Sequence, residues 1–206
     1  MKTLVLSPLM SMLFFLRIFT ANANIRLPRL ISDGIVLQRD VGIVIWGWAS
    51  QGEKISVHFQ NDSFVTTAGD DGKWRISLPA YEAGGPFVMV IQGDNEIVIK
   101  DILIGDVWVC SGQSNMAFKL KIVKDRYARD IEGAKNFNIR QFEVLRNTSL
   151  KVLDDIKSNG WKVANERTVL DFSAVAYFLL LNYMQNIKFR LVLSIPVLAA
   201  LPQKHG

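Results

Sequence analysis

Turn residues recur at short intervals over residues 32–95, and they constrain the fold more than any other feature of this sequence. Each turn combines glycine, which tolerates a positive φ, with aspartate, asparagine or proline. We predict strands between the turns, over residues 35–37, 43–48, 54–59, 63–67, 74–78, 87–92 and 97–103. Short strands at a spacing of about ten residues are typical of an antiparallel β-sandwich.

Three tryptophans lie in this β-rich region, at Trp46, Trp48 and Trp74. Together they could form a platform on which a sugar ring stacks. Because large aromatic side chains dominate protein cores, we expect at least two of the three to be core residues of the sandwich.

The character of the sequence changes near residue 100. Residues 102–104 and 107–109 form an almost continuous apolar strand, as in a parallel sheet that is covered on both faces. We then predict a polar loop, a helix beginning over Ala117–Ile122, a strand over 139–144, a turn at Asn159-Gly160, and a helix over 174–185 capped by Asp171 or Ser173. This alternation is an α/β order, so we place two domains at 24–100 and 101–189.

Composition narrows the possible partners and cofactors. The chain has 206 residues, of which 50% are hydrophobic, and 24 Lys and Arg against 19 Asp and Glu. No run of basic residues forms a patch, so we expect no nucleic-acid partner. The single cysteine, Cys110, excludes an intrachain disulfide and a cysteine-based zinc site, and we expect it to be a small buried hydrophobe.

The first 23 residues have the pattern of a secretory signal peptide. Lys2 gives a positive start, residues 4–16 are an apolar stretch too short to span a bilayer comfortably, and Ala21-Asn22-Ala23 matches a cleavage site. We therefore expect a secreted or periplasmic protein without stable membrane insertion after cleavage. The alternatives are an uncleaved membrane anchor and a misplaced start codon.

The segment VWVCSGQSNM, residues 107–116, ends an apolar strand in a small polar cluster. A loop that follows such a strand lies at the carboxyl edge of the sheet, where open α/β folds bind ligands. There Ser114 would lie beside free N–H groups of a helix start, which can hold an oxyanion. Met116 stands where the G-x-S-x-G elbow requires glycine. On these residues alone, a polar loop is as good an interpretation as a nucleophile.

The longer segment GDVWVCSGQSNM resembles the nucleophile block of the sialate O-acetylesterase family, a branch of the SGNH hydrolases. Three further segments resemble the same family in the same order, so that the resemblance covers about residues 25–188. They are SDGIVLQRDVGIVIWGWASQGEKISVHF, DDGKWRISLPAYEAGGPF and DFSAVAYF. The resemblance implies a jelly-roll-like β-sandwich followed by the start of an α/β/α SGNH hydrolase domain.

The resemblance also implies a metal-free, cofactor-free serine esterase that removes O-acetyl groups from sialic acids or other acetylated carbohydrates through an acetyl-enzyme. Ser114 is then the nucleophile, and its backbone N–H forms part of the oxyanion hole. Gly112, Gln113 and Asn115 complete the nucleophile loop. Asp106 matches an acidic position of the block, and we interpret it as structural.

The chain departs from the family after residue 189. The late Asp-x-x-His block is absent; His58 lies in a predicted strand, and His205 has Pro202 rather than aspartate three residues before it. A shifted reading frame from Phe189 is compatible with the family's sequence. We therefore expect residues 190–206 to be an out-of-frame tail that exposes apolar surface and an unpaired sheet edge, and the chain as given to be inactive.

Two other functions remain open on the sequence. One is a carbohydrate-binding β-sandwich fragment without catalysis. The other is an esterase of the same fold that acts on acetylated polysaccharides of the acetylxylan type.

Overall fold

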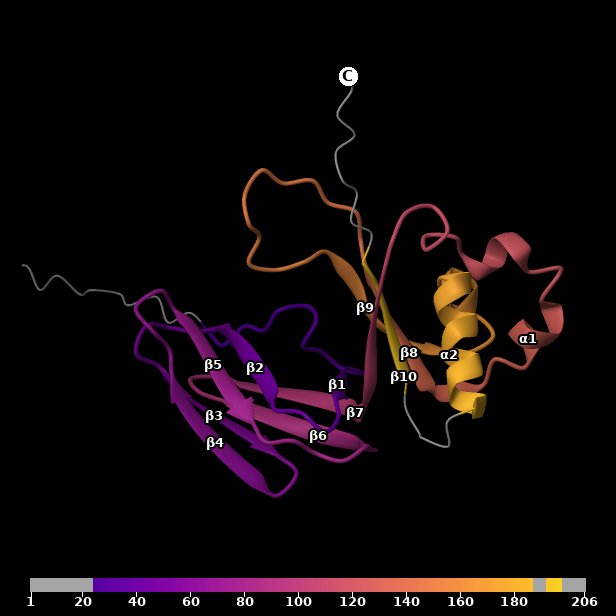
Figure 1. Cartoon of the computed structure of the whole chain (residues 1–206). Helices are drawn as coiled ribbons and strands as arrows, with labels where there is room; N and C mark the ends of the chain where they lie inside the picture. The colour runs from indigo at the N-terminus through magenta and orange to yellow at the C-terminus, as the bar shows by residue number, and fades with distance from the viewer. Residues whose placement is uncertain (1–23, 187–191, 198–206) are drawn as a thin grey trace, which may run out of the picture.

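A computed structural model describes residues 24–186 and 192–197, and strands predominate in it (Figure 1). The strands are β1 (Val36–Gln38), β2 (Ile43–Trp48), β3 (Lys54–Phe59), β4 (Asp62–Thr67), β5 (Lys73–Leu78), β6 (Gly84–Gln92), β7 (Glu96–Ser111), β8 (Asn136–Val144), β9 (Ser158–Ala164) and β10 (Val192–Val197). The helices are α1 (Ala128–Glu132) and α2 (Ala174–Asn186), with two short 3-10 helices, η1 (Leu120–Val123) and η2 (Thr168–Asp171). The strands predicted between residues 35 and 92 are confirmed, with ends that shift by a few residues.

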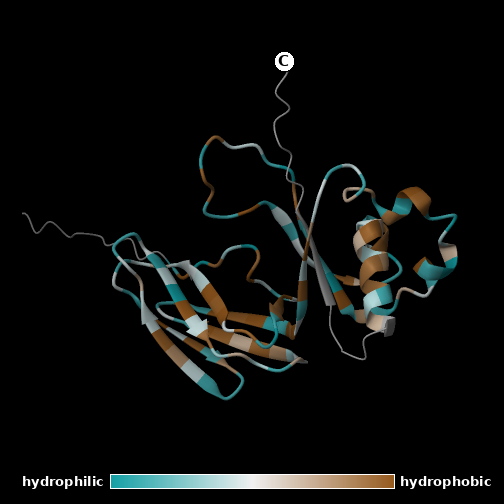
Figure 2. Ribbon diagram, viewed as in Figure 1, coloured by the Kyte–Doolittle hydropathy of each residue, from teal (hydrophilic) through white to brown (hydrophobic). Residues whose placement is uncertain are grey.

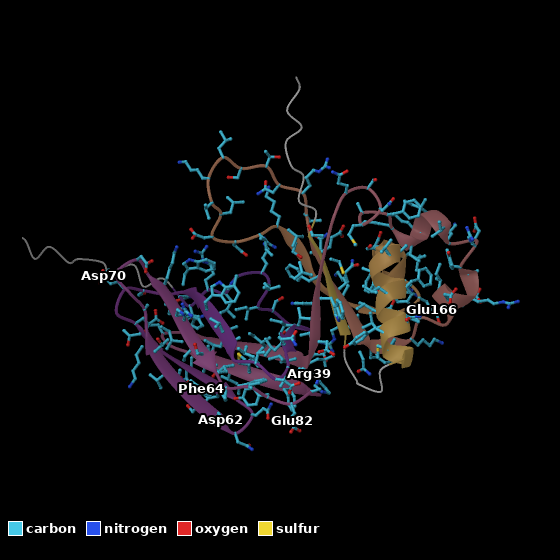
Figure 3. All side chains as sticks on the ribbon, in the orientation of Figure 1. Arg39, Asp62, Phe64, Asp70, Glu82 and Glu166 are labelled. Atoms are coloured by element: carbon cyan, nitrogen blue, oxygen red, sulfur yellow. The ribbon has the colours of Figure 1, made fainter. Side chains whose placement is uncertain are left out.

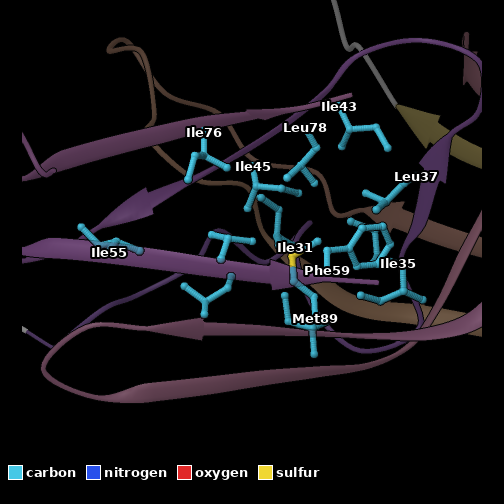
Figure 4. Close-up of a cluster of buried hydrophobic side chains, with 14 of the residues drawn as sticks. Ile31, Ile35, Leu37, Ile43, Ile45, Ile55, Phe59, Ile76, Leu78 and Met89 are labelled. Carbon is cyan, nitrogen blue, oxygen red and sulfur yellow. The ribbon is translucent and has the colours of Figure 1, made fainter. Parts of the chain in front are cut away.

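The first part of the chain places two layers of strands around an apolar core. Strands β2 and β5 form an antiparallel pair, and β4, β3, β6 and the start of β7 form the other layer. Alternate residues of β2 and β5 are buried, so each strand presents one apolar face. Figure 4 shows Ile45 and Leu78 from this pair, and Phe59 and Met89 from the facing strands, in one cluster. Burial of each such side chain contributes about 1.5–3 kcal/mol.

Strand β7 is shared by the two parts of the molecule. It pairs with β6 over Glu96–Ile104, with β1 over Leu103–Gly105, and with β10 over Asp106–Ser111. The predicted domain boundary near residue 100 therefore falls within a continuous strand, and the pairing partners change between Gly105 and Asp106. The division into domains at 24–100 and 101–189 stays a prediction.

The second part is a sheet with the strand order β7-β10-β8-β9 and a helix on one face. Strand β10 is parallel to β7 and β8, whereas β9 is antiparallel to β8. Helix α2 buries Tyr177 and Leu180 against the core of this part, and Figure 2 shows the helix as mostly hydrophobic. Ser173 caps α2, because its Oγ accepts a hydrogen bond of 3.4 Å from the N–H of Ala176. Of the two predicted caps, Asp171 instead pairs with Lys121.

Arg140 of β8 ties the two parts together. Its side chain is 3% exposed, and its Nη2 lies 2.7 Å from Oδ1 of Asp101 in β7. Its Nη1 donates 2.8 Å to the carbonyl of Gly34 and also donates to the carbonyl of Asp101. Asp101 has a φ of +57°, which turns its carbonyl and carboxylate toward the same guanidinium. This charge-assisted set fixes the angle between β8 and the first part of the chain.

Two local predictions are wrong. No helix begins at Ala117; a turn comes first, and η1 begins only at Leu120. Asn159-Gly160 is not a turn between elements but belongs to β9, where Gly160 has a φ of +77° and its N–H donates 3.0 Å to Ser158 Oγ. A glycine with positive φ inside a strand resembles a turn in sequence, because both need the same backbone freedom.

Strand β10 falls in the predicted out-of-frame tail. Residues 192–197 pair with β7 on one side and β8 on the other, so this segment is not an unpaired edge. Among the described residues, the open edges of this part of the sheet are the second half of β7, where Val109 is 68% exposed, and β9. Residues 1–23, 187–191 and 198–206 lie outside the described residues, and with them the signal peptide and most of the tail. The origin of the tail stays a prediction.

Candidate functional site

The loop that contains Ser114 leaves the sheet at its carboxyl edge. Ser111, the last residue of β7, lies level with Val197 of β10, which in turn lies level with Val144 at the end of β8. Three parallel strands thus end together, and the chain enters the loop at the position where open α/β sheets bind ligands. This agrees with the position that the sequence predicts for the loop.

The loop itself is a tight turn with exposed side chains. The carbonyl of Gln113 accepts hydrogen bonds of 3.1 Å from the N–H groups of Met116 and Ala117. Gln113, Ser114 and Asn115 are exposed, and Gly112 is half-buried. Within residues 24–186 and 192–197, the N–H groups of Ser114 and Asn115 have no acceptor. These two donors come from a turn, and not from a helix start as the sequence predicts. Free backbone N–H groups of a turn can bind an anion.

The segment DFSAVAYF holds the end of this loop in place. The N–H of Leu120 donates 3.0 Å to the carbonyl of Phe172, and the N–H of Ala174 donates 2.8 Å to the carbonyl of Phe118. Ser173, between them, is buried, and its Oγ lies 3.6 Å from Sδ of Met116. The loop is thus fixed to the start of α2 by main-chain hydrogen bonds that do not depend on exposed side chains.

Two polar residues of β8 support this contact, and the sequence analysis missed both. Gln141 is buried, and its Oε1 accepts a hydrogen bond of 3.0 Å from the N–H of Ser173. Glu143 pairs with Lys119 at 3.1 Å, at the end of the loop. The signal that could have identified them is a polar residue at a position of the strand where the alternation of buried and exposed residues predicts burial. A buried amide there needs a hydrogen-bond partner.

A polar cavity of about 240 Å³ lies next to the end of the loop. Its lining includes Lys119, Glu143, Lys162 and Asp171, but not Ser114. The hydrogen bond from Lys121, 2.9 Å long, lowers the pKa of Asp171 below its ordinary value. The cavity therefore offers charged groups of both signs beside the loop.

Asp106 of β7 connects the turn after β1 with α2, which agrees with its interpretation as a structural residue. Its carboxylate accepts hydrogen bonds of 2.8 Å from Arg39 Nε and 3.1 Å from the hydroxyl of Tyr183 in α2. Figure 3 labels Arg39 near the junction of the two parts. Burial, and then the bond to Asp106, raise the pKa of Tyr183, while Asp106 raises the pKa of Arg39. Asp106 lies five residues before Ser111, the end of β7, and its hydrogen bonds fix the second half of β7 against α2.

The sequence analysis expected neither His58 nor His205 to be the general base, and the structure does not place His58 near Ser114. His58 lies in β3 and is paired with Val90, which is paired with Val98 in β7. From Val98 to the end of β7 an extended strand covers about 40 Å, so His58 belongs to the far end of the molecule. His205 lies outside the described residues. Within the described part of the chain, no three His, Cys, Asp or Glu side chains are grouped to hold a metal ion.

Cys110 precedes the loop and is buried, as the sequence predicts. It is 6% exposed at the end of an otherwise exposed stretch of β7. Its place in the strand makes it a packing residue rather than a reactive group.

Known proteins resemble this chain in sequence and in structure. It is 31% identical over 109 residues to the sialate O-acetylesterase of Homo sapiens, covering 47% of this chain and 21% of that protein. It is 29% identical over 148 residues to that of Rattus norvegicus, covering 66% and 27%. No family model matches the chain.

A solved structure agrees with these relatives. The crystal structure of a carbohydrate acetylesterase from Xanthomonas citri superposes with a TM-score of 0.80 at 33% identity, and covers 84% of this chain and 40% of that one. The chain thus spans less than a third of the length of these two curated relatives and less than half of the solved chain. By sequence and by structure, the chain is similar to sialate O-acetylesterase-like carbohydrate esterases, as its serine block indicates.

Proposed function

We propose that Ser114 is the nucleophile of an esterase that removes O-acetyl groups from carbohydrates. The observation that carries this proposal is the exposed Ser114 hydroxyl in a turn at the carboxyl edge of the sheet, beside two N–H groups without acceptors among the described residues. The names of the relatives, which are esterases of acetylated sugars, support the same chemistry.

The proposed reaction is a metal-free acyl transfer in two steps. Ser114 Oγ attacks the acetyl carbonyl while a histidine takes its proton, and the negative charge on the carbonyl oxygen is held by the N–H groups of Ser114 and Asn115. The sugar leaves with the proton, and an acetyl-enzyme remains. Water then attacks the acetyl group, returns a proton to Ser114, and releases acetate.

The general base is the part of this reaction that the described residues do not supply. His58 is far from the loop along the sheet, as its pairing with β6 implies. We propose that an Asp-x-x-His segment provides the base in the active protein, and that the chain as given, with residues 190–206 out of frame, releases acetate slowly or not at all. Without a base, the hydroxyl of serine is a weak nucleophile.

We also propose that the first part of the chain is a jelly-roll-like β-sandwich and that the second is the start of an α/β/α SGNH hydrolase domain. The two layers around the apolar core support the first assignment. Three parallel strands with a helix on one face support the second.

The proposed substrate is an O-acetylated sialic acid, with acetylated polysaccharide of the acetylxylan type as the alternative. The proposed location is outside the cytoplasm, which rests on the signal-like residues 1–23. In the part of the chain that the structure describes, no helix has the length and apolar character needed to cross a membrane.

The test begins with the DNA across codons 186–206 and beyond. If the shifted frame is open through an Asp-x-x-His segment, protein from that frame is expected to release acetate from 9-O-acetyl sialic acid faster than from acetylxylan. Ser114→Ala lowers this release by about 10⁴-fold or more. Ser111→Ala, a matched control at the exposed end of β7, leaves it within about threefold. A closed frame contradicts the proposal and favours a glycan-binding fragment, whereas full activity in Ser114→Ala contradicts the assignment of Ser114 as the nucleophile.

A further inference from the structure

We propose that the outer face of the β2–β5 pair is a second carbohydrate site, which binds a sugar that carries a carboxylate. This site is separate from the Ser114 loop and does not rest on the esterase function. It lies on the face of the pair that is turned away from the apolar core.

The alternation of the two strands puts tryptophans and cations on this outer face. Trp46 lies directly opposite Arg75, and Trp48 lies opposite Lys73. Residues alternate between the two faces of a strand, so Trp74, which lies between Lys73 and Arg75, points inward. Of the three tryptophans, only Trp74 is fully buried. The expectation that at least two are core residues is therefore wrong. Trp46 is 36% exposed, so part of its indole is open to a sugar ring that stacks on this face.

Walls on two sides turn this face into a pocket of about 680 Å³. Thr66 and Thr67 of β4 form one side, and Leu153 and Asp154 of the loop between β8 and β9 form the other. Lys73 Nζ lies 2.8 Å from Asp154 Oδ1 and holds this loop against β5, toward which it arches in Figure 1. The volume lies within the range of small-molecule sites, which suits a mono- or disaccharide.

The charges of the pocket favour an acid. Lys73 is neutralised by Asp154, whereas Arg75 has no ion-pair partner among the described residues. The Arg26 guanidinium lies 4.8 Å from the ring centroid of Trp48 and adds a further positive charge near this face. A ring stacked on Trp46 would place a carboxylate within reach of Arg75, which can bind it through two parallel hydrogen bonds.

The test is calorimetric titration of the Ser114→Ala protein with the methyl α-glycoside of N-acetylneuraminic acid. This sugar carries no O-acetyl group, so binding is measured without hydrolysis. We expect binding that weakens as salt increases, and at least about tenfold weaker binding of methyl glucoside, which has no carboxylate. Trp46→Ala and Arg75→Gln are each expected to weaken binding about tenfold or more.

Trp108→Ala is the matched control, since Trp108 is 38% exposed but lies in β7 outside the pocket. It should leave binding unchanged.

Arg75→Gln alters one exposed side chain, so circular dichroism is expected to confirm that this variant folds. Unchanged binding in both Trp46→Ala and Arg75→Gln places the sugar elsewhere and overturns the proposal, as does equal binding of the neutral glycoside. Tighter binding of an oligothymidylate would assign the face to nucleic acid instead.

Discussion

The N–H of Ala174 donates a hydrogen bond of 2.8 Å to the carbonyl of Phe118, and so the start of α2 is joined to the loop that contains Ser114. Ala174 belongs to the segment DFSAVAYF, and Phe118 lies two residues after the segment GDVWVCSGQSNM; both segments resemble the same esterase family. The segment GDVWVCSGQSNM contains the serine, and DFSAVAYF fixes the main chain that follows it.

Ser173→Ala tests this support. The change removes the hydroxyl that caps α2 and contacts Met116 Sδ at 3.6 Å. We expect a loss of about 1 kcal/mol in the free energy of unfolding, the usual cost of a lost N-cap, measured by urea denaturation. In the active protein from the shifted frame, kcat should fall by a larger factor than KM changes. The substitution displaces the nucleophile loop and not the residues that bind the sugar. Ser63→Ala, on exposed β4, is the control and should alter neither quantity.

Gly112→Ala tests the shape of the loop directly. An added Cβ would lie 3.3 Å from Cβ of Met116, which is tighter than an ordinary contact, so the turn must shift. We expect kcat/KM for acetate release to fall about tenfold to a hundredfold, since small displacements of a nucleophile are costly. Gly42→Ala introduces a Cβ 3.6 Å from the carbonyl of Leu78, an ordinary contact, and should keep full activity. Equal effects of the two changes would show that the loop tolerates displacement.

Arg140→Leu tests the tie between the two parts of the chain. The change leaves the carbonyls of Gly34 and Asp101 without their buried donor. We expect a loss of about 2–4 kcal/mol in the free energy of unfolding, because the charged donor is removed while its acceptors on Gly34 and Asp101 remain. Chemical denaturation measures this loss. Arg167→Leu, at an exposed position, is the matched control, and an equal effect there would contradict the tie.

Tyr81 makes stability sensitive to high pH. Burial, and then its 2.8 Å hydrogen bond to Asp62, raise the pKa of Tyr81 from 10.0 to about 12. Between these values the folded protein holds a proton that the unfolded chain has lost, so stability falls as pH rises. The contribution is complete below pH 10.0 and is lost as the pH passes about 12.

Denaturation curves at a series of pH values from 9 upward compare the wild type with Tyr81→Phe. The wild type should lose more stability than the variant over that window, because phenylalanine has no proton to lose. Parallel curves for the two proteins would show that the tyrosine does not titrate differently in the folded state.

The strands of the first part could be predicted because their signals are local. Alternation over 43–48 and 73–78, bounded by glycine turns, gives both the strand and its buried face. The cap of α2 at Ser173 was also predictable, since a hydroxyl before an apolar helix is a local pattern. The position of Ser114 at the carboxyl edge followed from one apolar strand and the loop after it.

The remaining features depend on contacts between distant segments. The pairing of Arg140 with Asp101 and of Gln141 with Ser173 brings together residues that no local pattern connects. Strand β9 was missed because Gly160 has the appearance of a turn residue. The partial exposure of Trp46 and Trp48 depends on which side of the β2–β5 pair faces the other layer. The large size of a tryptophan side chain does not decide that side.

The most direct measurement is the site of the acetyl group during turnover. Protein from the frame that carries the Asp-x-x-His segment is mixed with an activated acetyl ester, quenched in acid, and digested for peptide mass spectrometry. The account predicts an acetyl group on Ser114, within the tryptic peptide Asp101–Lys119, that disappears in Ser114→Ala and persists in Ser111→Ala. Acetate release without any acetyl group on Ser114, or with the group on another residue, would contradict the claim that Ser114 is the nucleophile.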